Sequence, residues 1–206
     1  MNYFYEFYND LSRNLNNIMR YSGTYCLKPE SDSSHVTDMM AMCIRIADIV
    51  EEKYGEHLDK RELVYRCYIH DLDETPTGDI NRAFKYHDDN LYKAINSATK
   101  DIMLKHYKPD FIKEIENAKD ISNPYGLIIK VTDTLQSTLK IIEEVRLGNF
   151  HFRKVIIEHL GFLNELKDKL SDMIDYHENN YKDTLLSIIE DFYNEVELEV
   201  EKIKES

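Results

Sequence analysis

Apolar residues recur at steps of three and four along almost the whole chain, and this periodicity constrains the fold more than any other feature. Such spacing places the apolar side chains on one face of an α-helix, and we find no credible strand. Only six Gly and four Pro interrupt the 206 residues, which suits long helices better than a many-turned β architecture. The sequence therefore predicts an all-α fold. The expected helices span residues 2–19, 36–53, 60–71, 81–106, 124–147, 150–175 and 179–204, with a short one from Pro109.

Charge and length exclude several classes of protein. The chain has 26 Lys and Arg against 39 Asp and Glu, which gives a formal net charge of −13. Phosphate backbones and anionic membranes recruit basic surfaces, so we expect neither a polymeric nucleic acid nor a membrane as partner. No basic and apolar leader and no apolar run of about 20 residues is present, which predicts a cytoplasmic protein. A chain of 206 residues is expected to form one domain, or one domain with an appended helical segment.

The most informative pair of residues is His70-Asp71, which follows the largely apolar segment 63–69. A buried imidazole beside a buried carboxylate must be paired or bound to a metal, because an unpaired buried charge is costly. The chain has a second such pair, His87-Asp88, but the residues around it are polar and predict solvated surface.

Two further residues complete a candidate metal centre. His35 begins the apolar helix expected at 36–53, and Asp133 lies within the apolar helix expected at 124–147. Together with His70 and Asp71 they would supply a mixed shell of nitrogen and oxygen ligands. Such a shell suits one divalent Mn, Fe, Co, Ni or Zn ion better than Mg²⁺ or Ca²⁺, which prefer oxygen alone. The identity of the metal stays open.

The order His35, His70-Asp71 and Asp133 resembles the H…HD…D signature of HD-domain metal-dependent phosphohydrolases. Other segments are similar to the 5′-deoxynucleotidase (YfbR-like) branch of that family. They are Arg20-Tyr21-Ser22, Glu30 five residues before His35, the run HDLDETPTGD at 70–79 with Lys85-Tyr86 after it, and Val131-Thr132-Asp133 with the later segment 143–149.

The resemblance covers roughly residues 15–150, and it implies a fold and an organisation. Residues 1–150 would form an HD-domain helical bundle that carries the phosphohydrolase core. Residues 151–206 would form a C-terminal helical extension, packed on the core or at a dimer seam. We therefore also expect a homodimer or a higher homo-oligomer.

Three positions depart from the family pattern. The family commonly has Trp where this chain has Tyr21, Glu where it has Ser34, and Glu where it has Asn96. None of the three removes a predicted metal ligand. Tyr21 and Asn96 bear on the expected selectivity for sugar and base.

The resemblance also implies roles for residues around the metal. Glu74 can face the same cleft, where it would orient or deprotonate the attacking water, or protonate the leaving sugar oxygen. Arg20 would grip the phosphate through its planar guanidinium, and Lys85 would add a second positive charge. Asp79 would accept a hydrogen bond from a sugar hydroxyl, and Tyr21 would complete the substrate-binding set.

The leading hypothesis is a metal-dependent enzyme that removes the 5′-phosphate from (deoxy)nucleoside monophosphates. The closest alternative is a triphosphohydrolase or pyrophosphohydrolase acting on dNTPs such as dATP, but no extra basic cluster lies near the motifs to bind the larger charge. A non-catalytic nucleotide-binding protein would have lost a metal ligand, and none is missing. A helical interaction protein, and a two-metal phosphodiesterase that uses His87 and His106, are less favoured.

Overall fold

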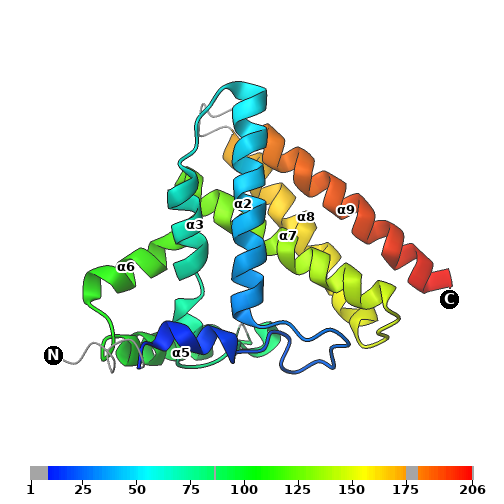
Figure 1. Ribbon diagram of the computed structural model, residues 1–206. Coiled ribbons are helices and arrows are strands. Elements are labelled where there is room, and N and C mark those ends of the chain that lie inside the picture. The colour runs from blue at the N-terminus through cyan, green and yellow to red at the C-terminus, as the bar shows by residue number, and fades with distance from the viewer. Residues whose placement is uncertain (1–8, 86, 175–180, 206) are drawn as a thin grey trace.

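The structure, a computed structural model, describes residues 9–85, 87–174 and 181–205 (Figure 1). Within these ranges the elements are helices, and the β-type pairing is an isolated bridge between Met19 and Ser31. The all-α fold expected from the apolar periodicity is confirmed. The elements, with η for a 3-10 helix, are η1 (Leu11–Asn16), α2 (Asp32–Tyr54), α3 (Lys60–Ile69), η2 (Leu72–Glu74), α4 (Arg82–Lys85), α5 (Asp89–Met103), α6 (Pro109–Ala118), α7 (Pro124–Arg146), α8 (Phe152–Ile174) and α9 (Tyr181–Glu205).

One expected helix is divided in two. Residues 81–106 form the short α4 and the longer α5, because Asp88 between them adopts an extended backbone conformation. The Asp88 side chain accepts hydrogen bonds from the N–H groups of Asn90 and Leu91, so it caps the start of α5. His87 and Asp88 are both exposed, as their polar surroundings indicate.

The N-terminal segment also differs from expectation. Residues 1–8 of the helix expected at 2–19 lie outside the described residues. The part that is described forms the 3-10 helix η1 rather than an α-helix. Asp10 caps it by accepting a hydrogen bond from the N–H of Ser12.

One hydrophobic core is shared by helices α2, α3, α7, α8 and α9. Fully buried side chains come from each of them and include Met39, Leu63, Ile128, Phe152 and Leu185. Thus α8 and α9 pack on the same core as the helices that carry the predicted metal ligands. A functional boundary near residue 150 and a dimer seam stay predictions.

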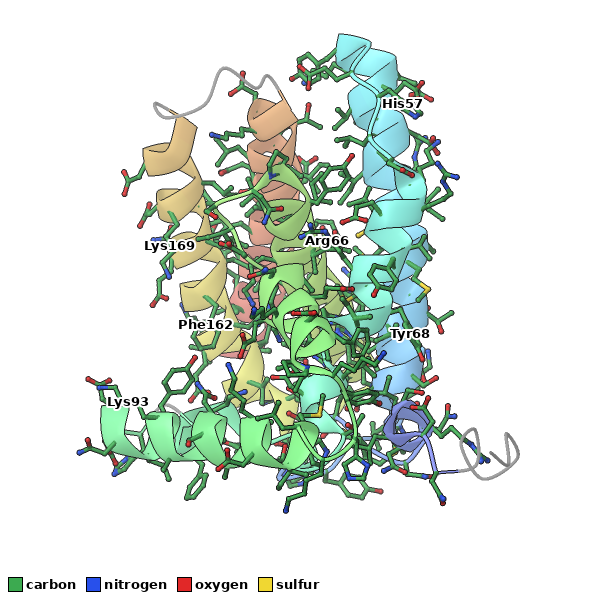
Figure 2. The ribbon with its side chains drawn as sticks, turned by 90° about the vertical axis from the view of Figure 1, so that its left-hand side faces the viewer. His57, Arg66, Tyr68, Lys93, Phe162 and Lys169 are labelled. Carbon is green, nitrogen blue, oxygen red and sulfur yellow. The ribbon has the colours of Figure 1, made fainter. Side chains whose placement is uncertain are left out.

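The arrangement of helices places the start of α2 and the end of α3 at the same end of the molecule, because the two run antiparallel (Figure 1). Helix α5 lies across this end, whereas His57, in the connection between α2 and α3, lies at the opposite end (Figure 2). A smaller apolar cluster that includes Leu15, Ile69, Leu72 and Met103 joins η1, α3, η2 and α5 there. None of the described helices combines the length and the apolar character that crossing a membrane requires.

The loop at 21–30 is fixed to α7 by the buried carboxylate of Glu144. Its oxygens accept hydrogen bonds from the backbone N–H groups of Leu27 at 2.8 Å and Lys28 at 2.9 Å, and from Lys140 Nζ at 2.7 Å. Burial raises the pKa of Glu144, but Lys140 and the other donors outweigh this and lower it to about 2. The loop therefore has a defined position, and so do the residues at its two ends.

Candidate metal centre and substrate site

Two backbone hydrogen bonds bring Arg20 to the first turn of α2. The N–H of Arg20 donates to the Glu30 carbonyl and the N–H of Asp32 donates to the Ile18 carbonyl, each at 3.0 Å. These bonds lie on either side of the isolated bridge. The first turn of α2 then carries His35 to the same place, because α2 begins at Asp32.

The predicted metal ligands converge at this end of the bundle. His70 is the C-cap of α3, Asp71 follows it, and Asp133 lies on α7. Ligand atoms of His35, His70 and Asp71 all lie within 4.8 Å of one another. Asp71 Oδ2 is 2.9 Å from His70 Nε2 and 3.8 Å from His35 Nε2. Asp133 Oδ1 is 3.4 Å from His35 Nε2, so it lies beside this group.

The imidazoles are oriented by hydrogen bonds at their other nitrogens. His70 Nδ1 donates to the Cys67 carbonyl at 2.7 Å, and His35 Nδ1 donates to Gln136 Oε1 at 2.5 Å. Both Nε2 atoms are buried and have no hydrogen-bond partner among the residues that the structure describes. Both Nε2 atoms face carboxylate oxygens, an arrangement that is repulsive unless a proton or a metal cation lies between them. The donor set therefore fits a divalent metal ion.

Gln136 extends the support behind His35. Its Nε2 donates to Glu30 Oε1 at 2.9 Å while its Oε1 accepts from His35. Gln136 is three residues after Asp133, so the two lie on one face of α7. The three-residue spacing from Asp133 is the sequence signal that could have identified Gln136 as part of the site. Groups of this kind fix the tautomer and orientation of a metal-binding imidazole.

Each predicted carboxylate ligand has a lysine partner. Burial disfavours the ionised form of Asp71, but His70 and Lys119 hold its pKa well below the usual range. Lys119 Nζ donates to Asp71 Oδ1 at 3.0 Å. Burial likewise opposes ionisation of Asp133, whose pKa is nevertheless held well below the usual range by Lys130, at 3.1 Å, and then by His35. Both carboxylates are therefore ionised at neutral pH, as metal ligands must be.

Arg20 lies beside the predicted metal ligands in a largely buried position, its side chain 14% exposed. Its Nη1 atom is 3.8 Å from Asp71 Oδ2 and 3.9 Å from Asp32 Oδ1. Its Nε atom is 3.5 Å from Glu30 Oε2, and Nη2 donates to Ser137 Oγ at 3.1 Å. The guanidinium is thus held in one orientation, with its charge adjacent to Asp71. This placement suits the binding of an anion at the same centre.

Glu74 follows Asp71 by one turn of the 3-10 helix η2, where its N–H donates to the Asp71 carbonyl at 3.0 Å. Its Oε2 atom is buried and lacks a hydrogen-bond partner within the described ranges. Burial, and then the charge of Asp71, raise the pKa of Glu74 well above its usual range. A carboxyl group in such surroundings is suited to exchange a proton with a substrate or water.

Asp79 and Tyr21 are joined to each other. Asp79 Oδ2 accepts a hydrogen bond from the backbone N–H of Tyr21 at 3.0 Å, and Ser22 Oγ donates to the Asp79 carbonyl at 3.3 Å. Tyr21 has a φ of 57°, which residues with a Cβ seldom adopt. Its ring packs against Phe152, with the ring centroids 5.3 Å apart. The backbone of Tyr21 thus holds Asp79, while contact of either side chain with substrate stays a prediction.

Lys85 and Lys119 contrast in their relation to the centre. Lys85 is the last residue of α4. In the part of the chain that the structure describes, its side chain makes no hydrogen bond or ion pair with the predicted metal ligands or with Arg20. Its neighbour Tyr86 lies outside that part. Lys119, at the end of α6, reaches Asp71 across 48 residues of sequence. No local pattern signals such a contact, whereas the predicted role of Lys85 stays a prediction.

Asp32 is a further residue that the motifs do not single out. It is fully buried at the start of α2, and neither carboxylate oxygen has a hydrogen-bond partner among the described residues. Burial raises its pKa to about 7, although Arg20 acts in the opposite direction. An Asp in an unfolded chain has a pKa of about 3.9, so from about pH 4 to 7 the folded metal-free chain keeps a proton that the unfolded chain loses. Over this window, the contribution of Asp32 lowers the stability as the pH rises.

We therefore expect Asp32→Asn to raise the melting temperature of the metal-free protein more at pH 8 than at pH 5. The reason is that the uncharged amide abolishes the cost of a buried charge, which is present only at the higher pH. Thermal denaturation in a chelator, followed by circular dichroism, measures both values. Asp38→Asn, at an exposed position on α2, is the matched control. Equal shifts at the two pH values would contradict the expectation.

Comparison with solved structures defines the class of this fold. An HD-domain phosphohydrolase from Listeria innocua matches with a TM-score of 0.64 and 21% identity, covering 97% of this chain and 92% of that one. The HD phosphohydrolase DatZ of cyanophage S-2L, solved with dA and one catalytic Zn²⁺ ion, matches with a TM-score of 0.62 and 15% identity. That match covers 90% of this chain and 95% of the cyanophage chain. The chain has the HD-domain phosphohydrolase fold.

Sequence relatives narrow this class. A family model described as YfbR-like 5′-deoxynucleotidase matches residues 6–184. The 5′-deoxynucleotidase YfbR of Salmonella arizonae is 30% identical over 157 residues, which cover 72% of this chain and 77% of that protein. The 5′-deoxynucleotidase of Shewanella oneidensis is 28% identical over 141 residues, or 66% of this chain and 72% of that one. The chain belongs to the YfbR-like 5′-deoxynucleotidase family, which confirms the resemblance seen in its motifs.

Proposed function

We propose that this chain is a phosphohydrolase that removes the 5′-phosphate from deoxynucleoside monophosphates. One observation carries the proposal: two buried imidazole Nε2 atoms and the carboxylates of Asp71 and Asp133 converge beside the held guanidinium of Arg20. A cation site next to an anion site is what hydrolysis of a phosphomonoester requires. The names of the family and of its relatives support the 5′-deoxynucleotide as substrate.

His35, His70, Asp71 and Asp133 would hold one divalent metal. When bound, such an ion lowers the pKa of a coordinated water and polarises the phosphoryl group. The mixed nitrogen and oxygen ligands suit Mn, Fe, Co, Ni or Zn. The catalytic Zn²⁺ of the cyanophage enzyme supports testing Zn²⁺ first.

The residues around the metal ligands divide the remaining work. Arg20 would bind the phosphate through two N–H groups and stabilise negative charge that develops on its oxygens. Glu74 would take a proton from the attacking water as the new P–O bond forms. The bond to the sugar 5′-oxygen then breaks, and that oxygen leaves with a proton from Glu74 or from solvent. Asp79 would accept a hydrogen bond from a sugar hydroxyl.

The substrate assay compares dAMP, AMP and dATP with protein that has been stripped of metal and reloaded with Zn²⁺, Mn²⁺ or Co²⁺. We expect inorganic phosphate to be released from dAMP, and the release to cease in a chelator. The two positive groups that flank Asp71, Arg20 and Lys119, match the charge of one phosphate better than that of three. Release of triphosphate or pyrophosphate from dATP with inert dAMP would replace this proposal by the alternative activity.

Partners and location stay predictions. A small nucleotide is the expected ligand, and the net charge of −13 argues against polymeric nucleic acid. A cytoplasmic location suits an enzyme that acts on free nucleotides. A homodimer is open to test by light scattering at several protein concentrations.

A further inference from the structure

Lys119 is a cation at the centre that the motifs do not include. It is the C-cap residue of α6, and its Nζ donates to Asp71 Oδ1 at 3.0 Å. The other oxygen of the same carboxylate, Oδ2, faces both imidazoles and lies 3.8 Å from Arg20 Nη1. Arg20 and Lys119 therefore flank one metal-ligand carboxylate from opposite oxygens.

The ammonium group of Lys119 has donors to spare. It carries three N–H groups, and Asp71 is its one hydrogen-bond partner within the described ranges. Its side chain is 35% exposed, against 14% for Arg20. The Lys119 side chain is thus more open to solvent than that of Arg20 while it stays bound to Asp71.

Several carboxylates act on Lys119. Asp71, Asp73, Glu74 and Asp133 surround it, and although burial lowers its pKa, these carboxylates outweigh burial and raise the pKa above the ordinary value. A lysine ammonium is positively charged at neutral pH in any case, because its ordinary pKa is about 10.4. A phosphate dianion that approaches a protein of net charge −13 needs such local charge.

We propose that Lys119 is the second cation of the phosphate site and binds a phosphate oxygen of the substrate from the side opposite Arg20. The proposal rests on the proposed function, since it assigns a residue to that reaction. Lys119 would thus supply the second positive charge at the phosphate, the role that the sequence analysis predicts for Lys85. The contact with Asp71 positions its Nζ, and the two remaining N–H groups are the donors to phosphate.

The competing interpretation is that Lys119 only neutralises and orients Asp71. In that case its removal alters metal affinity and leaves phosphate affinity unchanged once the metal site is full. The two interpretations are separated by measuring phosphate binding directly on protein of known metal content.

The experiment uses the full chain preloaded with one equivalent of Zn²⁺ and no excess metal, titrated with inorganic phosphate in a calorimeter. We expect Lys119→Met to weaken phosphate binding by about tenfold or more at equal metal content, because a charge-assisted hydrogen bond is lost. Lys119→Arg, which keeps the charge and donors, should stay within about threefold of wild type. For the substrate dAMP, Lys119→Met should raise KM with a smaller effect on kcat, because the hydrogen bond to phosphate is made in the ground state.

Lys113→Met is the matched control. Lys113 lies on the same helix, carries the same charge and pairs with Asp110 at 3.8 Å on the exposed surface. Phosphate affinity in Lys119→Met equal to that of wild type and Lys113→Met would overturn the proposal, as would a loss that is explained wholly by lower metal content. The titration measures phosphate binding and needs no turnover. Absence of phosphate release from dAMP would therefore contradict the proposed function, while the role of Lys119 is still decided by the titration.

Discussion

Replacing Asp71 by Ala should abolish both metal binding and phosphate release. The site converges on this residue: Oδ2 lies 2.9 Å from His70 Nε2 and 3.8 Å from His35 Nε2, and Oδ1 accepts from Lys119. Loss of a group that merely orients a metal ligand costs about 10–100-fold in metal affinity, so loss of the ligand should cost roughly 100-fold or more. Metal content after dialysis, measured by mass spectrometry, and phosphate release from dAMP are the two readouts.

A second variant guards against a simple folding defect. Asp71→Asn keeps the shape of the side chain and removes its charge, so it should also lose metal while the helical circular-dichroism signal is kept. Asp38→Ala removes an acid from an exposed position on α2 and should change neither readout. A wild-type metal content in Asp71→Ala would mean that these four residues do not form the metal centre.

The four predicted metal ligands could be identified from the sequence because each lies in a recognisable context. His35 and Asp133 lie within apolar helical stripes, and His70-Asp71 closes an apolar helix, so all four polar groups are directed toward the interior. The structure places them together as that reasoning requires. Polar residues in apolar surroundings need a partner, and this is the physical reason why the pattern is informative.

The remaining site residues depend on tertiary structure. Arg20 reaches the centre through the hydrogen bonds that pair residues 18–20 with 30–32. Lys119 reaches Asp71 only because α6 ends beside η2, and a lysine at a helix end resembles an ordinary solvated residue. Asp32 looks like a favourable acid in the first turn of a helix, yet it is fully buried. Local spacing carries no information about these contacts.

The fold was predictable to a similar degree. Three- and four-residue spacing identifies α2, α7, α8 and α9, because each buries one continuous stripe in the shared core. The division between α4 and α5 follows from the side chain of Asp88, which competes with the helix by capping the next one. Such competition is decided by a single hydrogen-bonding group, and periodicity does not register it.

The net charge of −13 gives the basic residues of the site their importance. Asp71 and Asp133 are each paired with a lysine, and Arg20 is held among three acidic groups. Without these cations the carboxylates would repel one another and the substrate alike. The site therefore combines strong attraction for a divalent cation with local positive charge for an anion, and this combination suits metal-assisted phosphate chemistry.

Replacing Glu74 by Gln should lower kcat by about 10²–10⁴-fold while metal content and phosphate affinity stay near wild type. Glu74 lies one 3-10 turn after Asp71, and its Oε2 atom is buried without a hydrogen-bond partner in the described part of the chain. The amide keeps the shape and loses the ability to exchange a proton. Rates are measured at saturating dAMP across pH 5 to 9, on protein of known metal content.

The pH profile assigns the role. A general base acts when it is ionised, so wild-type kcat should fall as the pH drops through the pKa of Glu74, which burial and Asp71 raise above the usual carboxyl range. A general acid would instead lose activity as the pH rises through that pKa, and in either case Glu74→Gln removes the corresponding limb. Glu52→Gln, at an exposed position on α2, is the control. Unchanged kcat and an unchanged profile in Glu74→Gln would exclude Glu74 from proton transfer, because the amide of Gln cannot exchange the proton in its place.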